Sequence, residues 1–226
     1  MSKYHTLEDD EYMIKLAKMS NLIWIDHHKS AIEECENNDG FVPFDQNTEI
    51  GIGACQLTWE YCFDKSIPGS VKLLSEYDVW YHEDERTLPF QYGMRLYNTI
   101  PDDNMEFWES VFYELPQKIL SDGHVVQKYI EQDNKKYCGA CAFETTLDNL
   151  KFIAINRMLT NSQMFDSVWD NTKYDAMLTF GWYKDKWTCS LYTDKEGVDV
   201  SIVAKNRGGG GHKQAAGFQC DILSFI

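Results

Sequence analysis

A short apolar run that leads directly into an acid and two histidines constrains the fold of this chain most. Residues 22–25 are Leu-Ile-Trp-Ile, and neither glycine nor proline interrupts them. A run that is apolar on both faces predicts a buried strand of a parallel sheet. Because ligands of open α/β sheets bind at the carboxyl ends of the strands, this strand places Asp26, His27 and His28 where a site is expected.

The side chains of Asp26, His27 and His28 are suited to binding a metal. Carboxylates and neutral imidazoles are both good ligands for zinc or manganese. Neighbouring side chains in an extended segment point in opposite directions, so one histidine can bind a metal while the other faces a substrate. The alternative, a set of polar turn residues, explains a single histidine better than an acid followed by two.

The segments around this strand have helical patterns. Residues 7–19 carry three acids in the first turn and lysines toward the end, and residues 29–36 predict a short helix that ends at Asn-Asn-Asp-Gly. A helix, a strand and a helix in this order predict a parallel sheet. Gly51 and Gly53 precede another predicted helix, where they suit either close packing or a bound phosphate.

A second apolar stretch, residues 71–80, contains acids near its end. Asp78 lies among large apolar residues, and an unpaired carboxylate there would be costly to desolvate. Asp78 is therefore expected to be paired, hydrogen-bonded or metal-bound. A helix-capping or turn role for Asp78 is the alternative.

The charge and the cysteines limit the class of partner and the cellular location. A formal net charge of −15 opposes sequence-independent binding to duplex nucleic acid and favours small phosphate compounds or short oligonucleotides. No apolar run approaches the ~20 residues of a membrane span, and the polar N-terminus is not a signal peptide. The seven scattered cysteines predict reduced thiols, and we expect a cytoplasmic protein that does not bind membranes.

The pattern of the chain changes in its second half, which predicts two domains. Residues 103–136 read as helical with a break at Pro116. Beyond Tyr137 the patterns predict strands at 152–155, 175–182 and 186–193 and short helices at 162–169 and 198–205. We therefore expect a lobe over residues 1–118, a linker helix over 119–138 and a smaller α+β domain over 139–226.

Four consecutive glycines at 208–211 form the second candidate site. Small residues follow them, which indicates that something approaches the backbone closely. Bare amide groups in such a loop can form a nest for an anion, and Lys205, Arg207 and Lys213 place positive charge nearby. These features favour a phosphate- or nucleotide-binding loop over a flexible linker.

Together, Asp26-His27-His28 and Gly209-Gly210-Gly211-His212, with Ala215-Ala216-Gly217 after it, resemble the DHH phosphoesterase family of RecJ-like proteins. The first motif names the family, and the second is similar to the GGGH signature of its associated C-terminal domain. The resemblance implies an α/β fold in which a parallel-sheet lobe precedes a smaller α+β substrate-binding domain. It also implies a hydrolase that uses Mn²⁺, with Mg²⁺ as the alternative, to cleave a phosphodiester in short oligonucleotides or a small nucleotide.

The resemblance also implies roles for single residues. His27 would bind metal, His28 would contact the scissile phosphate or support the metal ligands, and Asp26 would bind the metal or orient a ligand. Asp78 would be the later acidic ligand, with Glu76 as its rival. The residues expected to hold substrate are Gly209, Gly210, Gly211 and His212, assisted by Arg157, Asn161 and Ser162.

This sequence departs from the family pattern at its N-terminus. Family members begin with a strand leading to a His/Asp-x-Asp motif and a second strand ending in Asp, and we expect this chain to lack both. The lobe would then be N-terminally incomplete, with half of its metal ligands absent and its activity impaired. The alternative function is that of an inactive nucleotide- or single-strand-binding homologue. Because the incomplete sheet would expose an edge, we also expect either a partner chain that supplies the missing strands or a homo-oligomer.

Overall fold

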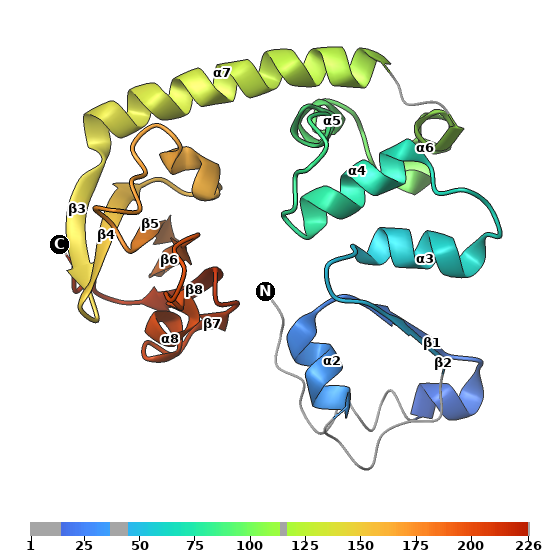
Figure 1. Ribbon diagram of the computed structural model, residues 1–226, viewed down its shortest axis with the longest axis horizontal. Helices are drawn as coiled ribbons and strands as arrows, with labels where there is room; N and C mark the ends of the chain where they lie inside the picture. The colour runs from blue at the N-terminus through green and yellow to red at the C-terminus, as the bar shows by residue number, and fades with distance from the viewer. Residues whose placement is uncertain (1–14, 37–44, 114–116, 226) are drawn as a thin grey trace. The chain divides into compact units, whose positions relative to one another are not determined.

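A computed structural model describes residues 15–36, 45–113 and 117–225 of the chain (Figure 1). The chain divides into two compact units, an N-terminal unit of residues 4–128 and a C-terminal unit that begins at residue 129. The division falls within the long helix α7 (Gln117–Cys141). The expected linker helix, 119–138, lies inside α7, whereas most of the helix expected at 7–19 and the break at Pro116 lie outside the described residues.

A parallel pair of strands carries the Asp-His-His motif in the N-terminal unit. Strand β1 (Ile23–Asp26) pairs with β2 (Asp45–Thr48), in a register that runs from Ile23–Asp45 to Asp26–Thr48. Helix α2 (Lys29–Glu36) follows β1, as its sequence predicts. All four residues of β1 are only partly buried, so the expectation of a strand buried on both faces is wrong. The polar sequence of β2 has no strand pattern and did not predict this partner.

The remaining helices of the N-terminal unit are packed around one apolar core. Their bounds are α3 (Ala54–Cys62), α4 (Gly69–Asp78), α5 (Thr87–Met94), the 3₁₀ helix η1 (Pro101–Asp103) and α6 (Met105–Tyr113). The core is formed by buried side chains of α4, α5, α6 and the start of α7, namely Leu73, Phe90, Met94, Val111, Ile119 and Leu120. Helices α5 and α7 approach so closely that a Cβ atom added at Gly123 would lie 1.7 Å from the carbonyl oxygen of Pro89.

The C-terminal unit is built on a six-stranded sheet with the strand order β3-β4-β5-β6-β8-β7. The strands are β3 (Phe143–Leu147), β4 (Leu150–Asn156), β5 (Ala176–Tyr183), β6 (Lys186–Tyr192), β7 (Gly210–Gly211) and β8 (Ala215–Cys220). Strands β4 and β5 are parallel, and the other neighbouring pairs are antiparallel. The strands and helix expected at 152–155, 175–182, 186–193 and 198–205 correspond to β4, β5, β6 and helix α8 (Val200–Lys205).

Both faces of this sheet are covered by apolar side chains, because alternate strand residues face opposite sides. One core contains Phe152, Ala154, Leu178, Phe180, Leu191 and, from α8, Val200 and Val203. The other contains Ile153, Ile155, Met177, Cys138 of α7, and Met164 and Phe165 of the 3₁₀ helix η2 (Ser162–Phe165). The helix expected at 162–169 is thus shorter than predicted.

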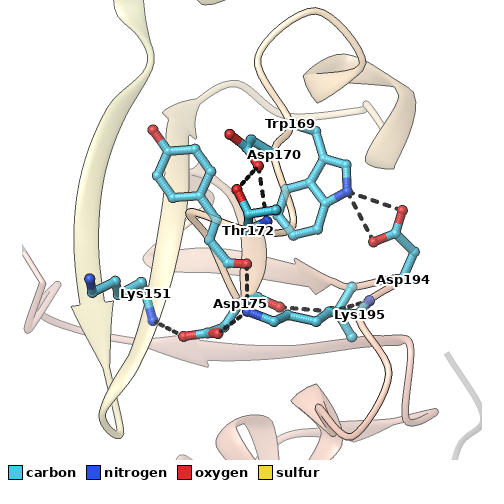
Figure 2. Close-up of polar contacts among 9 residues, drawn as sticks. Lys151, Trp169, Asp170, Thr172, Asp175, Asp194 and Lys195 are labelled. Atoms are coloured by element: carbon cyan, nitrogen blue, oxygen red, sulfur yellow. Dashed lines mark hydrogen bonds and ion pairs between the residues drawn. The ribbon is translucent and has the colours of Figure 1, made fainter.

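Asp175 fixes the start of β5 to the neighbouring segments (Figure 2). Its carboxylate accepts hydrogen bonds from the Lys151 backbone amide (2.9 Å) and from Lys195 Nζ (2.7 Å). Thr193 Oγ1 donates to the Asp175 carbonyl oxygen at 2.8 Å. These contacts hold the backbone at the ends of β4 and β6 in register with β5. Among the described residues, no helix has the length and apolar composition that crossing a bilayer requires.

Candidate metal centre

The Asp-His-His motif lies at the carboxyl end of β1, and its three side chains converge. Potential ligand atoms of Asp26, His27 and His28 all lie within 4.8 Å of one another. The two imidazole rings are 4.5 Å apart between centroids and meet edge to face. In the part of the chain that the structure describes, this is the one group of three or more such side chains that are close enough to share an ion.

The Asp26 carboxylate organises the backbone and one ring of this motif. Its Oδ1 accepts hydrogen bonds from the His27 amide (2.7 Å), the His28 amide (2.9 Å) and His28 Nδ1 (2.7 Å). Burial raises the pKa of Asp26, but these bonds outweigh burial and keep its pKa below the ordinary value of 3.8. Asp26 is therefore ionised at neutral pH, and it holds His28 as the tautomer with a proton on Nδ1.

A second acid reaches the motif from α4. Asp78 is the last residue of that helix, and its Oδ2 lies 3.5 Å from His27 Nε2. The His27 side chain is 11% exposed and that of Asp78 is 54% exposed, so the pair is open to solvent on the carboxylate side. Of the two acids that the sequence left open, Asp78 is the one beside the histidines.

The separation of His27 and Asp78 fits two ligands of one ion. Nitrogen and oxygen ligands lie about 2.1 Å from a zinc ion, so two of them at a tetrahedral angle are about 3.4 Å apart. The observed 3.5 Å matches that spacing. The hydrogen bond from His28 to Asp26 is of the kind that orients metal-binding histidines, in which one ring nitrogen donates to a carboxylate. The donor set therefore fits a divalent cation.

Glu76 has a different and structural role. Its Oε2 accepts hydrogen bonds from Thr87 Oγ1 (2.6 Å) and from the Asp84 amide (3.0 Å). Thr87 is the first residue of α5 and is fully buried. Glu76 thus anchors the segment that enters α5, and the described contacts do not bring it to the histidines.

One neighbour of the centre was not expected from the sequence. Desolvation raises the pKa of the Cys55 thiol, and the adjacent Asp78 carboxylate raises it further. The thiol also donates to the Val71 carbonyl oxygen at 3.8 Å. Cys55 lies in α3, and nothing in the scattered cysteine pattern indicated that this thiol lies near an acid.

Gly53 lies where two helices pack closely, which decides between the two roles that the sequence left open for it. Its amide donates to Ser75 Oγ at 2.7 Å, and an added Cβ atom would lie 2.8 Å from Ser75 Cα. This amide is therefore used within the protein. Of the two roles that the sequence left open for Gly53, close packing is therefore the one observed, because α3 and α4 meet at this residue.

The four glycines of the C-terminal unit do not form one open loop. The amides of Gly208 and Gly209 donate to the carbonyl oxygens of Lys205 and Ala204 and so terminate α8. Gly210 and Gly211 form β7, which pairs with β8. Glycine is required because a Cβ atom at Gly209 would lie 2.1 Å from the Gly217 carbonyl oxygen. The group that approaches this backbone closely is strand β8 of the same sheet. The amides of Gly208 and Gly209 are used within the protein and are therefore not part of the expected anion nest.

The tip of this hairpin carries the other residues expected to bind substrate. His212 is exposed in a tight turn, in which its amide donates to the Ala215 carbonyl oxygen at 2.8 Å. Lys205 and Lys213 are also exposed. Arg207, in contrast, is held by two hydrogen bonds to the Asp148 carboxylate (2.9 and 2.8 Å). The local positive charge therefore comes from the two lysines.

Arg157, Asn161 and Ser162 lie on the segment that leads from the end of β4 into η2. Asn161 caps this short helix, with its side chain accepting from the Gln163 amide at 3.1 Å. Ser162 is the first residue of η2. Arg157 Nη2 donates to Asp133 Oδ2 at 2.9 Å, while its buried Nη1 has no hydrogen-bond partner among the described residues.

Comparison with known proteins gives two relatives of similar sequence. The chain is 28% identical over 236 residues to the uncharacterized protein R106 of Acanthamoeba polyphaga mimivirus, which covers 95% of this chain and 50% of that protein. It is 23% identical over 219 residues to the oligoribonuclease NrnB of Bacillus subtilis (strain 168), with 89% and 53% covered. The chain spans about half the length of the curated relatives it matches.

Among solved structures, the chain is similar to the pGpG-specific phosphodiesterase PggH of Vibrio cholerae. The identity is 15% and the TM-score is 0.48, with 86% of this chain and 83% of that chain covered. No family model matches the chain.

Proposed function

We propose that this chain is a DHH-type phosphoesterase that hydrolyses a phosphodiester in short oligonucleotides or a small nucleotide with the help of a divalent metal. The observation that carries the proposal is the convergence of Asp26, His27 and His28 at the end of β1, together with the contact of 3.5 Å between His27 and Asp78 of α4. The similarity to NrnB, whose name describes an oligoribonuclease, supports the same class of substrate.

The side chains of the centre have distinct roles in this proposal. His27 and Asp78 hold the metal, for which Mn²⁺ is our first choice and Mg²⁺ the alternative. A divalent ion held by these two side chains would supply Lewis acidity, which would activate water as a nucleophile and offset the charge of the phosphate. Asp26 keeps the His28 ring in one orientation by accepting from Nδ1, so Nε2 is the nitrogen that would bind the metal or, when it also carries a proton, donate to the scissile phosphate.

The hairpin of the C-terminal unit is proposed, as a site of its own, to bind a phosphate or a terminal nucleotide. Gly210, Gly211 and His212 would contact it, and Lys205 and Lys213 would supply local positive charge in a chain of net charge −15. Arg157, Asn161 and Ser162 are proposed to assist.

The test is hydrolysis by the purified chain in the presence of Mn²⁺, with a short oligoribonucleotide as substrate. We expect activity that His27→Ala and Asp78→Asn each reduce at least about a hundredfold, because each removes a metal ligand. His124→Ala and Asp64→Asn are matched controls on exposed positions elsewhere in the unit and should retain full activity. Activity that survives in both His27→Ala and Asp78→Asn would overturn the proposal.

A second candidate function is nucleotide binding without hydrolysis. The described residues bring together the ligands of one ion, whereas two-metal phosphodiester hydrolysis needs carboxylates for both ions. No turnover with any divalent metal, combined with saturable nucleotide binding, would favour this function. Gly210→Val tests the hairpin in that case, because a Cβ atom at Gly210 meets nothing within 4 Å and the variant should fold.

A further inference from the structure

Aromatic side chains lie on both sides of Asp78 in the sequence, and we call Tyr77, Trp80 and His82 the aromatic cluster. The ring centroids of Trp80 and His82 are 4.4 Å apart, and Tyr77 lies 5.6 Å from each of them. Arg95 Nη2 donates to the Tyr77 hydroxyl at 2.9 Å. The cluster thus combines exposed ring surface with a guanidinium next to the candidate metal centre.

Trp80 has a left-handed backbone conformation, which is unfavourable for tryptophan. Helix α4 ends in a Schellman motif, in which the Trp80 amide donates to the Tyr77 carbonyl oxygen (3.2 Å) and the Tyr81 amide to that of Glu76 (2.9 Å). Trp80 occupies the position that glycine usually takes, with φ of 60°. His82 is also left-handed, with φ of 45°. A side chain with a Cβ atom is strained in this region, so glycine would be the more stable residue at position 80.

Burial in the core does not account for a tryptophan at this position. The Trp80 residue is 44% exposed, and its neighbour Tyr81 is 63% exposed. Strained residues persist where the surrounding structure holds them, and they concentrate at ligand-binding and catalytic sites. A strained, exposed tryptophan two residues from Asp78 therefore indicates a role for the ring itself.

We propose that the exposed face of Trp80 stacks against a nucleobase of the substrate whose phosphate would be bound by the metal that His27 and Asp78 hold. Aromatic faces beside a guanidinium bind unpaired bases without regard to sequence. The Cα atoms of Asp78 and Trp80 are at most about 7 Å apart, so the ring lies within the reach of a nucleoside attached to that phosphate. The inference rests on the proposed function and adds to it the residue that recognises the base of the substrate.

The test is a substitution that removes the indole ring of Trp80 and also relieves the strain of its left-handed backbone. Trp80→Gly places the favoured residue at a left-handed position, so the variant should fold with an equal or higher melting temperature. Two substrates are compared, a diribonucleotide and its abasic analogue with the same phosphodiester. We expect Trp80→Gly to raise KM for the diribonucleotide about tenfold and to leave the abasic analogue unchanged. Trp80→Phe should restore most of the affinity, and Trp182→Ala, at an exposed tryptophan of the other unit, should change neither.

Equilibrium binding of the same two probes separates this inference from the proposed function. If the chain hydrolyses neither substrate but Trp80→Gly weakens binding of the diribonucleotide alone, hydrolysis is wrong and the stacking role stands. Equal effects of Trp80→Gly on both probes, no effect on either, or no binding of either by the unaltered chain would each overturn the stacking role, whatever the result for hydrolysis.

Discussion

His27 Nε2 lies 3.5 Å from Asp78 Oδ2, which joins the end of strand β1 to the last residue of helix α4. A contact with a carboxylate this exposed contributes little to stability, because solvent screens it. The contact matters for the chemistry of the site, because it brings the Asp78 carboxylate to a group that already contains Asp26, His27 and His28. The predictions below follow from this arrangement and from the packing that supports it.

Asp78→Asn should weaken the binding of Mn²⁺ by about ten- to a hundredfold, because an amide is a poorer ligand than a carboxylate. Stability should change by no more than about 0.5 kcal/mol, as is usual for exposed residues. Calorimetric titration with Mn²⁺ and urea unfolding of the same samples measure both effects. Unchanged Mn²⁺ affinity would show that Asp78 is not a ligand.

Glu76→Gln should lower stability and leave Mn²⁺ binding unchanged, which is the opposite of what we expect for Asp78→Asn. It removes the charge from hydrogen bonds to Thr87 Oγ1 and the Asp84 amide, so we expect a loss of about 1 kcal/mol in the free energy of unfolding. The affinity for Mn²⁺ should remain that of the unaltered chain. Because the two acids lie on the same helix, each variant serves as the control for the other, and a reversed result would assign the ligand to Glu76.

Gly123→Ala should destabilise the N-terminal unit by about 2 kcal/mol, since overpacking exceeds the gain in helix propensity. The added Cβ atom would lie 1.7 Å from the Pro89 carbonyl oxygen and would force α5 and α7 apart. Gly139→Ala is the control in the same helix, because nothing lies within 4 Å of a Cβ atom there. That variant should instead gain up to about 1 kcal/mol. Urea unfolding distinguishes the two, and equal effects would contradict the close helix contact.

Asp148 should make the C-terminal unit sensitive to acid. Hydrogen bonds from Arg207 and Asn206 lower the pKa of Asp148 from 3.8 to about 2. Because the folded-state pKa lies below the unfolded one, the stabilisation is fully present above about pH 4 and is lost as the pH falls toward 2.

Asp148→Asn should therefore cost about 1 kcal/mol at neutral pH, after allowing for solvent screening, and should flatten the stability profile between pH 4 and pH 2. Asparagine tolerates the left-handed backbone of this position, where φ is 49°, so the substitution tests the charge alone. Thermal unfolding across this pH range is the measurement. An unaltered acid profile in the variant would rule out the Asp148–Arg207 pair as its source.

Local patterns in the sequence predicted several elements well. The strand before Asp26 and the helix at 29–36 are present because their signals, apolar runs and helix ends, act over a few residues. The hairpin of β5 and β6 was predicted for the same reason. The polar strand β2 was missed, because its place in the sheet comes from backbone pairing with β1 and not from its own side chains.

The glycines show where a local pattern has two physical meanings. Four glycines next to lysines favoured an anion-binding loop, and the inference that something approaches the backbone closely was sound. The approaching group is strand β8, since an added Cβ atom at Gly211 would lie 2.5 Å from Ala216 Cα. Only the pairing of β7 with β8 distinguishes a tight hairpin from an open loop.

The sequence by itself determined that an acid and two histidines follow a strand, because that strand is specified by four consecutive apolar residues. It did not determine which later acid joins them. Glu76 and Asp78 are two positions apart in one helix, so their side chains project about 200° apart around its axis. The docking of α4 decided which of these directions meets His27, and that choice depends on packing between segments far apart in the chain.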